Sequence, residues 1–290
     1  MAEPSLEGGR ESELEGSRMS FMEHLRELRV RVRNSAIALI LCFFVAYTFK
    51  GEILYFLVRP LIDAMVERGA DPELVAQALY YRDLLEPFWT FISLALWSGL
   101  FLASPFVFYQ LWKFISPGLY KRERLIGVAF AVSSAICFIG GALFCYYLVL
   151  PVAYDFLLGF ATSNLAEIEH AFGLEYEFDY NIALKYEQNL RPYVDLTRNL
   201  MLAFGLIFEL PVLIGVLAGL GMVTHRSLWK FNRWWIVISF VIGAILTPTP
   251  DPLSQTLMAG PMIVLYNLSI LIAWVITRRR EARLGSPPPE

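Results

Sequence analysis

Long uncharged hydrophobic runs alternate with polar segments along the chain. A helix needs about 20 mostly apolar residues to cross a hydrocarbon core about 30 Å thick. Three runs exceed this length without any Asp, Glu, Lys or Arg, a fourth contains a single acid, and two are shorter. The pattern predicts an all-α integral membrane protein with six transmembrane helices. The runs cover residues 34–49, 88–112, 125–154, 199–223, 234–246 and 252–277.

The fifth run, residues 234–246, is the shortest. Its 13 residues would cover only about 20 Å at 1.5 Å per residue. Two interpretations stay open. In the first, the helix is short and thins the bilayer, tilts its neighbours or recruits partner helices. In the second, the helix continues back through Phe231 and Asn232, and Lys230 and Arg233 extend their charged ends toward the headgroups.

The composition agrees with a membrane protein. The 290 residues are 57% hydrophobic and 18% charged, with a mean hydropathy of +0.52. A soluble domain is about half apolar and a quarter charged, so the composition excludes a water-soluble enzyme. The first twenty residues lack the basic and apolar regions of a cleaved signal peptide, so the first helix should act as the targeting signal. We predict a disordered cytoplasmic tail (1–19), a six-helix transmembrane domain (20–278) and a second cytoplasmic tail (279–290).

Basic residues are concentrated on one side of the predicted membrane. Six spans place both termini on the same side, which holds 17 of the 24 Lys and Arg residues. The opposite side holds 7 of them, together with 16 of the 27 Asp and Glu residues. The positive-inside rule therefore predicts that both termini are cytoplasmic. Residues 50–87 and 155–198 would then be external loops, with a short surface helix at residues 70–79.

Glu209 is the one ionisable residue inside the fourth run. A charged carboxylate at this depth is costly, so we expect it to be protonated, paired or exposed to water. It could serve as a polar contact for a partner helix, as a proton-sensitive group or as part of a water-filled cavity. The structural alternative is an acid that is hydrogen-bonded within its own bundle. Pro211 lacks an N–H and should free a backbone carbonyl nearby.

The residue types of catalytic and metal sites form no recognisable pattern. The three histidines are scattered, the three cysteines lie inside hydrophobic runs, and no nucleotide-binding or hydrolase motif occurs. We therefore expect no metal, no cofactor, no nucleic acid and no enzymatic activity. Two other classes stay open, a proton-coupled transporter of small solutes that uses Glu209 and a polytopic membrane enzyme. The absence of an internal repeat argues against the transporter.

Two segments at the predicted cytoplasmic face combine acids, arginines and aromatic residues. Residues 20–33, SFMEHLRELRVRVR, place Glu27 among arginines directly before the first span. Taken alone, they fit a juxtamembrane helix with i,i+4 ion pairs. Residues 101–124 end in ISPGLYKRER, where Glu123 lies among basic residues. Taken alone, they fit an aromatic belt with positive-inside charge.

These segments resemble the TatC family, the multispanning receptor subunit of the twin-arginine protein translocase. The resemblance covers nearly all of residues 20–277. It implies six spans with both ends inside, arranged as a concave, glove-like bundle with short fifth and sixth helices, in the cytoplasmic (inner) membrane of a bacterium. Four motifs carry it, in order: HLRELRVR at 24–31, SPFVFYQLWKFISPGLYKRER at 104–124, AFGLIFELPV at 203–212 and LTPTPDPLSQTLMAGPM at 246–262.

The resemblance also implies a role. Such a receptor binds signal peptides with two adjacent arginines, recruits single-span subunits of the TatA and TatB types, and assembles with other copies of itself. Folded proteins then cross the bilayer using the proton-motive force. By resemblance, Glu27 and Glu123 meet the arginine pair, which suits the preference of guanidinium groups for carboxylates. The same site includes Arg29, Phe114, His24, Leu28 and Tyr120. Glu209 matches an intramembrane acid of the family. A patch for partner subunits is matched by Thr247 and Gln255, and external-loop positions are matched by Pro60 and Asp251.

Overall fold

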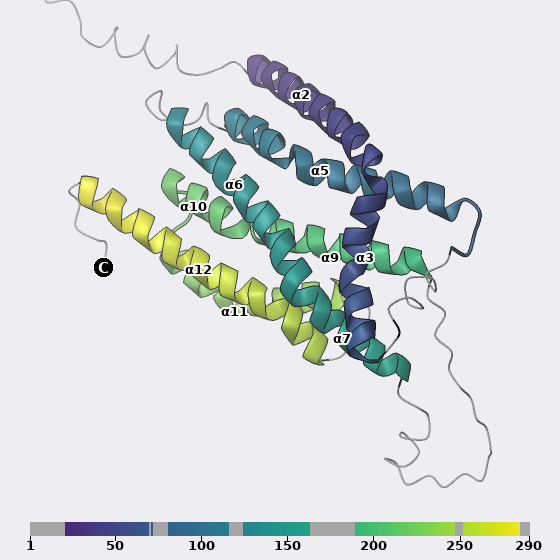
Figure 1. The fold of residues 1–290 in the computed structure, drawn as a ribbon. Coiled ribbons are helices and arrows are strands. Elements are labelled where there is room, and N and C mark those ends of the chain that lie inside the picture. The colour runs from purple at the N-terminus through teal and green to yellow at the C-terminus, as the bar shows by residue number, and fades with distance from the viewer. Residues whose placement is uncertain are drawn as a thin grey trace, which may run out of the picture.

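A computed structural model describes residues 21–69, 71, 81–115, 124–162, 189–246 and 252–284. Nearly all of these residues are helical (Figure 1), which confirms the predicted all-α fold for this part of the chain. The helices are α2 (Phe21–Thr48), α3 (Lys50–Glu67), α5 (Glu86–Ile115), α6 (Arg124–Phe144), the π-helical turn η3 (Cys145–Val149), α7 (Leu150–Thr162), α9 (Leu190–Ile207), α10 (Leu210–Leu220), α11 (His225–Leu246) and α12 (Pro252–Leu284).

Six helical stretches of the described residues are long and apolar enough to cross a membrane, as the sequence predicts. The third stretch combines α6, η3 and α7, and the fourth combines α9 and α10. The fifth and sixth are the shortest, with 22 and 24 residues against 27 to 33 for the others. Because α11 begins at His225, the fifth helix does continue back through Phe231 and Asn232.

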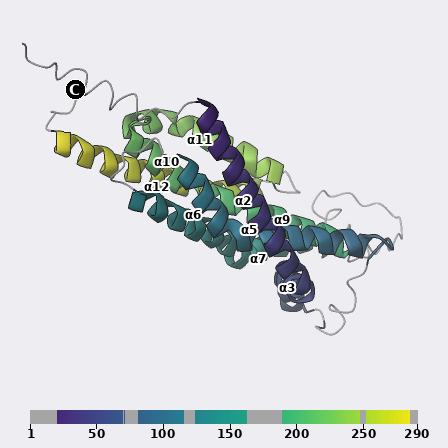
Figure 2. The same ribbon diagram turned by 90° about the horizontal axis from the view of Figure 1, so that it is seen from above.

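The six spans pack side by side (Figure 1). α2 packs on α5, α5 on α6 and α6 on α9, and α10 packs on α12, which also packs on α11. The sixth span therefore lies between the fourth and the fifth. Seen from above, α3 lies at the opposite end of the molecule from the C-terminal end of α12 (Figure 2).

The prediction of a loop over residues 50–87 is wrong for its first half, which forms the helix α3. Apolar residues recur there at helical spacing, so Leu57 and Leu61 are buried against α7 and α9 although charged residues interrupt the segment. An amphipathic helix needs no continuous hydrophobic run, so the uncharged runs of the sequence do not reveal α3. The second external loop is also shorter than predicted, because α7 continues to Thr162 and α9 begins at Leu190.

Pro60, which the sequence placed in an external loop, lies inside α3 instead. Proline has no N–H, so the carbonyl of Phe56, one turn earlier, loses its helical donor. The Tyr146 hydroxyl donates to this carbonyl at 2.8 Å, and the rings of Phe56 and Tyr146 stack with centroids 4.1 Å apart. Tyr146 comes from η3, where the wider π-turn redirects neighbouring side chains. A contact with the third span thus satisfies the group that Pro60 leaves free.

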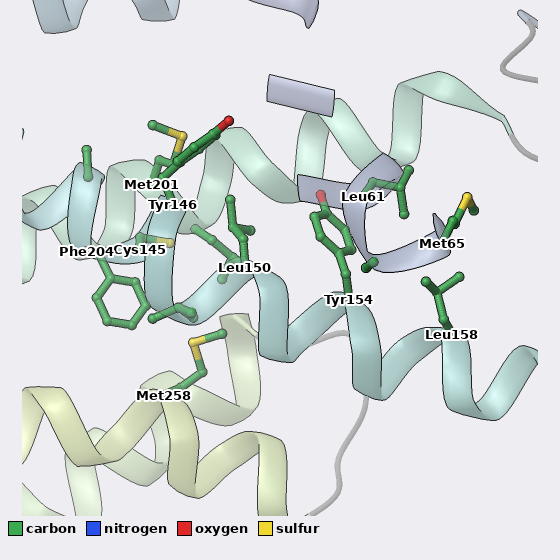
Figure 3. Packing of buried hydrophobic residues seen from close by; sticks show 14 residues of the cluster. Leu61, Met65, Cys145, Tyr146, Leu150, Tyr154, Leu158, Met201, Phe204 and Met258 are labelled. Atoms are coloured by element: carbon green, nitrogen blue, oxygen red, sulfur yellow. The ribbon is translucent and has the colours of Figure 1, made fainter. Parts of the chain in front are cut away.

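The largest buried cluster joins α3 to the third span, α9 and α12. Figure 3 shows Leu61 and Met65 of α3 beside Tyr154 and Leu158 of α7. The Tyr154 hydroxyl also forms a buried hydrogen bond with the Thr197 hydroxyl of α9. This cluster fixes α3 across the ends of the third and fourth spans.

α6 and α9 approach each other closely at two glycines. A β-carbon on Gly141 would lie 2.5 Å from the carbonyl oxygen of Phe204, and one on Gly205 would lie 2.9 Å from the Phe138 ring. Small residues allow such an approach between membrane helices, where packing drives association. Neither glycine can gain a side chain unless the two helices move apart.

We expect Gly141→Ala to destabilise the purified protein by about 1–3 kcal/mol, because its β-carbon would overlap a backbone oxygen of α9. The thermal denaturation midpoint in detergent measures the effect. Gly140→Ala is the matched control, since a β-carbon there has no neighbouring atom within 4 Å. Equal midpoints for the two variants would contradict the close approach of α6 and α9.

Candidate functional site

An ion pair near the start of α2 also contacts α5. Arg31 Nη2 donates to Glu27 Oε1 at 2.6 Å, which is the i,i+4 pairing that the sequence suggested. Arg31 Nη1 donates to the side-chain oxygen of Gln110 on α5 at 3.2 Å. Through Arg31, the Glu27 carboxylate is held on the side of α2 that faces α5.

The ion pair is partly buried and keeps unused hydrogen-bonding capacity. The side chains of Glu27 and Arg31 are only 19% and 16% exposed. Within the described part of the chain, Glu27 Oε2 and Arg31 Nε are buried without a hydrogen-bond partner. Burying an unpaired carboxylate oxygen is unfavourable, and a charged donor is the strongest group that can relieve it. Glu27 is therefore suited to accept a second cation.

Two aromatic rings and an apolar cavity lie next to the ion pair. His24, one turn before Glu27, stacks on Phe114 of α5 with ring centroids 4.4 Å apart and planes 18° apart. Leu28, Arg31 and Phe114 help to line a cavity of about 390 Å³ between α2 and α5. The structure thus brings four predicted site residues together, namely His24, Glu27, Leu28 and Phe114.

Of the other three predicted residues of this site, the structure describes only one. Arg29 is exposed on α2. Tyr120 and Glu123 lie outside the described residues, in the connection between the end of α5 at Ile115 and the start of α6 at Arg124.

Glu209 lies where the fourth span is interrupted. α9 ends at Ile207, and Glu209 occupies the position directly before α10 without capping that helix through its side chain. Pro211 follows in the first turn of α10, and its missing N–H explains why the regular helix stops here. Glu209 Oε1 is buried and has no partner among the described residues.

A short chain of polar side chains leads from Glu209 to the second span. The carboxylate is close to the hydroxyl of Ser134 on α6, and the indole N–H of Trp112 on α5 donates to that hydroxyl at 2.8 Å. Ser134 is fully buried. Glu209 thus lies near a buried polar pair, and among the described residues its Oε1 stays available for a donor.

The predicted patch for partner subunits is described only at Gln255, because Thr247 lies outside the described residues. The predicted external-loop residue Asp251 also lies outside them. Gln255 is half-buried near the start of α12. Its backbone oxygen would lie 3.3 Å from a β-carbon on Gly243, so α11 and α12 are close together at this level.

Comparison with known proteins identifies the family of the chain. The family model for the Sec-independent protein translocase protein (TatC) matches residues 23–261. TatC of Koribacter versatilis is 37% identical over 270 residues, covering 91% of this chain and 90% of that protein. TatC of Aquifex aeolicus is 34% identical, covering 91% of this chain and 98% of that protein. The crystal structure of a twin-arginine translocase receptor, TatC, matches with a TM-score of 0.69 and 34% identity, covering 88% of this chain and all of that one. The chain belongs to the TatC family.

Membership of the TatC family settles the class of protein. The chain is a membrane-spanning component of the Sec-independent protein translocase, a receptor subunit family without catalytic activity. The resemblance seen in the four sequence motifs is confirmed, and neither a solute transporter nor a membrane enzyme is supported.

Arg31 and Gln110 are site contacts that the sequence did not assign in this TatC protein. Arg31 could have been found from its position four residues after Glu27. Gln110 is the one amide side chain in the run 88–112, and it is only 5% exposed, which suggests a buried polar partner. That the two residues meet depends on how α2 packs on α5, which no local pattern encodes.

We expect Ser134→Ala to destabilise the protein by about 1–3 kcal/mol, because the buried indole N–H of Trp112 loses its acceptor. Thermal denaturation in detergent measures the change. Ser133→Ala is the matched control, one residue away on α6 and less buried. Ser134→Ala should cost little more in a Trp112→Phe background, where the indole is absent. An equal loss of stability in both backgrounds would show that the indole–hydroxyl bond is not the cause.

Proposed function

We propose that the cluster around Glu27 binds the arginine pair of twin-arginine signal peptides. The observation that carries the proposal is the partly buried Glu27 carboxylate, which has one oxygen on Arg31 and, among the described residues, no partner for the other. A peptide guanidinium can donate to the free oxygen in the geometry that such groups prefer. Lysine offers a point charge instead of a planar fork, so it should be a poorer ligand.

The surroundings of Glu27 support a peptide ligand that carries both charge and apolar side chains. The stacked rings of His24 and Phe114 flank the carboxylate on one side. The cavity between α2 and α5 continues from Leu28 along mainly apolar residues. We assign the second peptide arginine to Glu123, and Arg29 and Tyr120 to the rim of the same site.

The orientation and the partners follow as proposals from charge and family. The side of the membrane to which the sequence assigns 17 basic residues faces the cytoplasm, where signal peptides arrive before export. The membrane is the bacterial inner membrane, and the proton-motive force drives transport. Single-span subunits of the TatA and TatB types dock at Gln255 and Thr247, and several copies of the chain assemble into the receptor complex. Pro60 and Asp251 act on the external side.

We expect Glu27→Ala to weaken binding of a twin-arginine signal peptide at least tenfold while the denaturation midpoint changes little. The substitution removes the acceptor of a charge-assisted hydrogen bond. Fluorescence anisotropy of a labelled peptide with the detergent-purified protein measures it. Glu23→Ala, which removes an exposed acid one turn earlier on α2, is the matched control and should bind within twofold of the unsubstituted protein. Equal binding by the two variants would exclude Glu27 from the site.

For Glu209, we propose a neutral hydrogen-bonding role within the bilayer. Glu209→Gln should therefore retain most of the export of a folded reporter protein, whereas Glu209→Ala should lose most of it, because only the amide can still pair with Ser134 and a further donor. Export is measured in cells at matched levels of the three proteins. Full export by Glu209→Ala would show that the side chain is dispensable.

A further inference from the structure

A second cavity lies between α2, α3, α5, α6 and α9, apart from the cluster around Glu27. Its volume is about 550 Å³, and all but two of its sixteen lining residues are hydrophobic. The two exceptions are Ser98 and Arg198. We call this cavity the apolar groove.

The apolar groove opens on the surface of the spans. Val45 of α2 and Leu102 of α5 line it and are 49% and 58% exposed, although both belong to helices that cross the membrane. In the bilayer such a groove is filled by a lipid chain or by a helix of another subunit. A phospholipid carries an anionic phosphate at the end of its apolar chains, so a cation next to the groove favours the lipid.

Lys50, next in the chain to a residue that lines the groove, has no carboxylate partner among the described residues. The Lys50 ammonium group is 4.3 Å from the centre of the Tyr47 ring and 5.3 Å from that of Phe91. Its neighbour Phe49 lines the groove. No ion pair involves Lys50 among the described residues. The charge is therefore available to a ligand outside the protein.

Arg198, at the wall of the groove, is already engaged. It pairs with Asp195 at 2.9 Å, donates to the Ser93 hydroxyl at 2.6 Å and lies 5.6 Å from the centre of the Trp97 ring. It therefore shapes the wall, and Lys50 is the cation that can meet an anion. Lys50 is one of only 7 basic residues on the predicted external side, which carries 16 acids.

We propose that the apolar groove binds one acyl chain of an anionic phospholipid whose phosphate contacts Lys50. The apolar wall takes the chain, and the ammonium group neutralises the phosphate where the groove meets the headgroup region. This site is independent of signal-peptide binding, so neither proposal depends on the other.

Native mass spectrometry of the full chain in detergent, titrated with phosphatidylglycerol or phosphatidylethanolamine, tests the headgroup contact. We expect one phosphatidylglycerol to bind at least fivefold more tightly than phosphatidylethanolamine. Lys50→Gln should remove this preference and Lys50→Arg should keep it. Lys113→Gln is the matched control, because Lys113 also lies over a ring, that of Tyr109 at the other end of α5. Equal binding of the two lipids, or an unchanged preference in Lys50→Gln, would overturn the proposal.

A second pair of variants tests the apolar groove itself. Val45→Trp should fill the groove from an exposed position and weaken the binding of both lipids at least fivefold. Leu41→Trp, on an exposed part of α2 that does not line the groove, should bind both lipids normally. Unchanged lipid binding by Val45→Trp would overturn the site. If Val45→Trp instead abolished cross-linking to a single-span subunit and left lipid binding intact, the groove would be a helix-docking site and the proposal would fail.

Discussion

Inside a bilayer, each polar group must find its partner within the protein, because no water is available. This constraint fixes how the helices of this TatC protein meet. The same need holds for groups that are buried outside the six spans: Pro60 frees the Phe56 carbonyl, and the Tyr146 hydroxyl satisfies it, which joins α3 to the third span. Trp112 donates to Ser134, which joins the second span to the third. Apolar burial alone could not place these helices, since the surrounding lipid is as apolar as their side chains.

Two carboxylates depart from this constraint, and both are proposed functional groups. Glu27 Oε2 and Glu209 Oε1 are buried without a partner in the part of the chain that the structure describes. A buried polar atom without a partner is unfavourable, so it persists where a ligand or a second protein completes it. Glu27 lies at the predicted cytoplasmic end and Glu209 at membrane depth. A cation from a ligand would complete Glu27, and a hydrogen-bond donor within the membrane would complete Glu209.

The long uncharged runs were enough to predict six spans, because crossing a bilayer demands a length and composition that few other elements share. They were not enough to find α3, whose buried face is visible only at helical spacing. The motif around Glu27 led to His24, Leu28 and Phe114, which the structure brings together. The link from Arg31 to Gln110 and the close approach at Gly141 depend on packing between spans. The sequence pattern within one helix does not predict which residues of another helix it contacts.

The proposed function of this TatC protein depends on one interaction, the selection of guanidinium groups by a carboxylate on α2. The direct measurement is the affinity of the detergent-purified, unsubstituted protein for a twin-arginine signal peptide and for the same peptide with both arginines changed to lysine. We predict at least tenfold tighter binding of the arginine peptide, because only a guanidinium group presents a planar fork to the carboxylate. Equal affinity for the two peptides, measured with and without the single-span subunits, would contradict it.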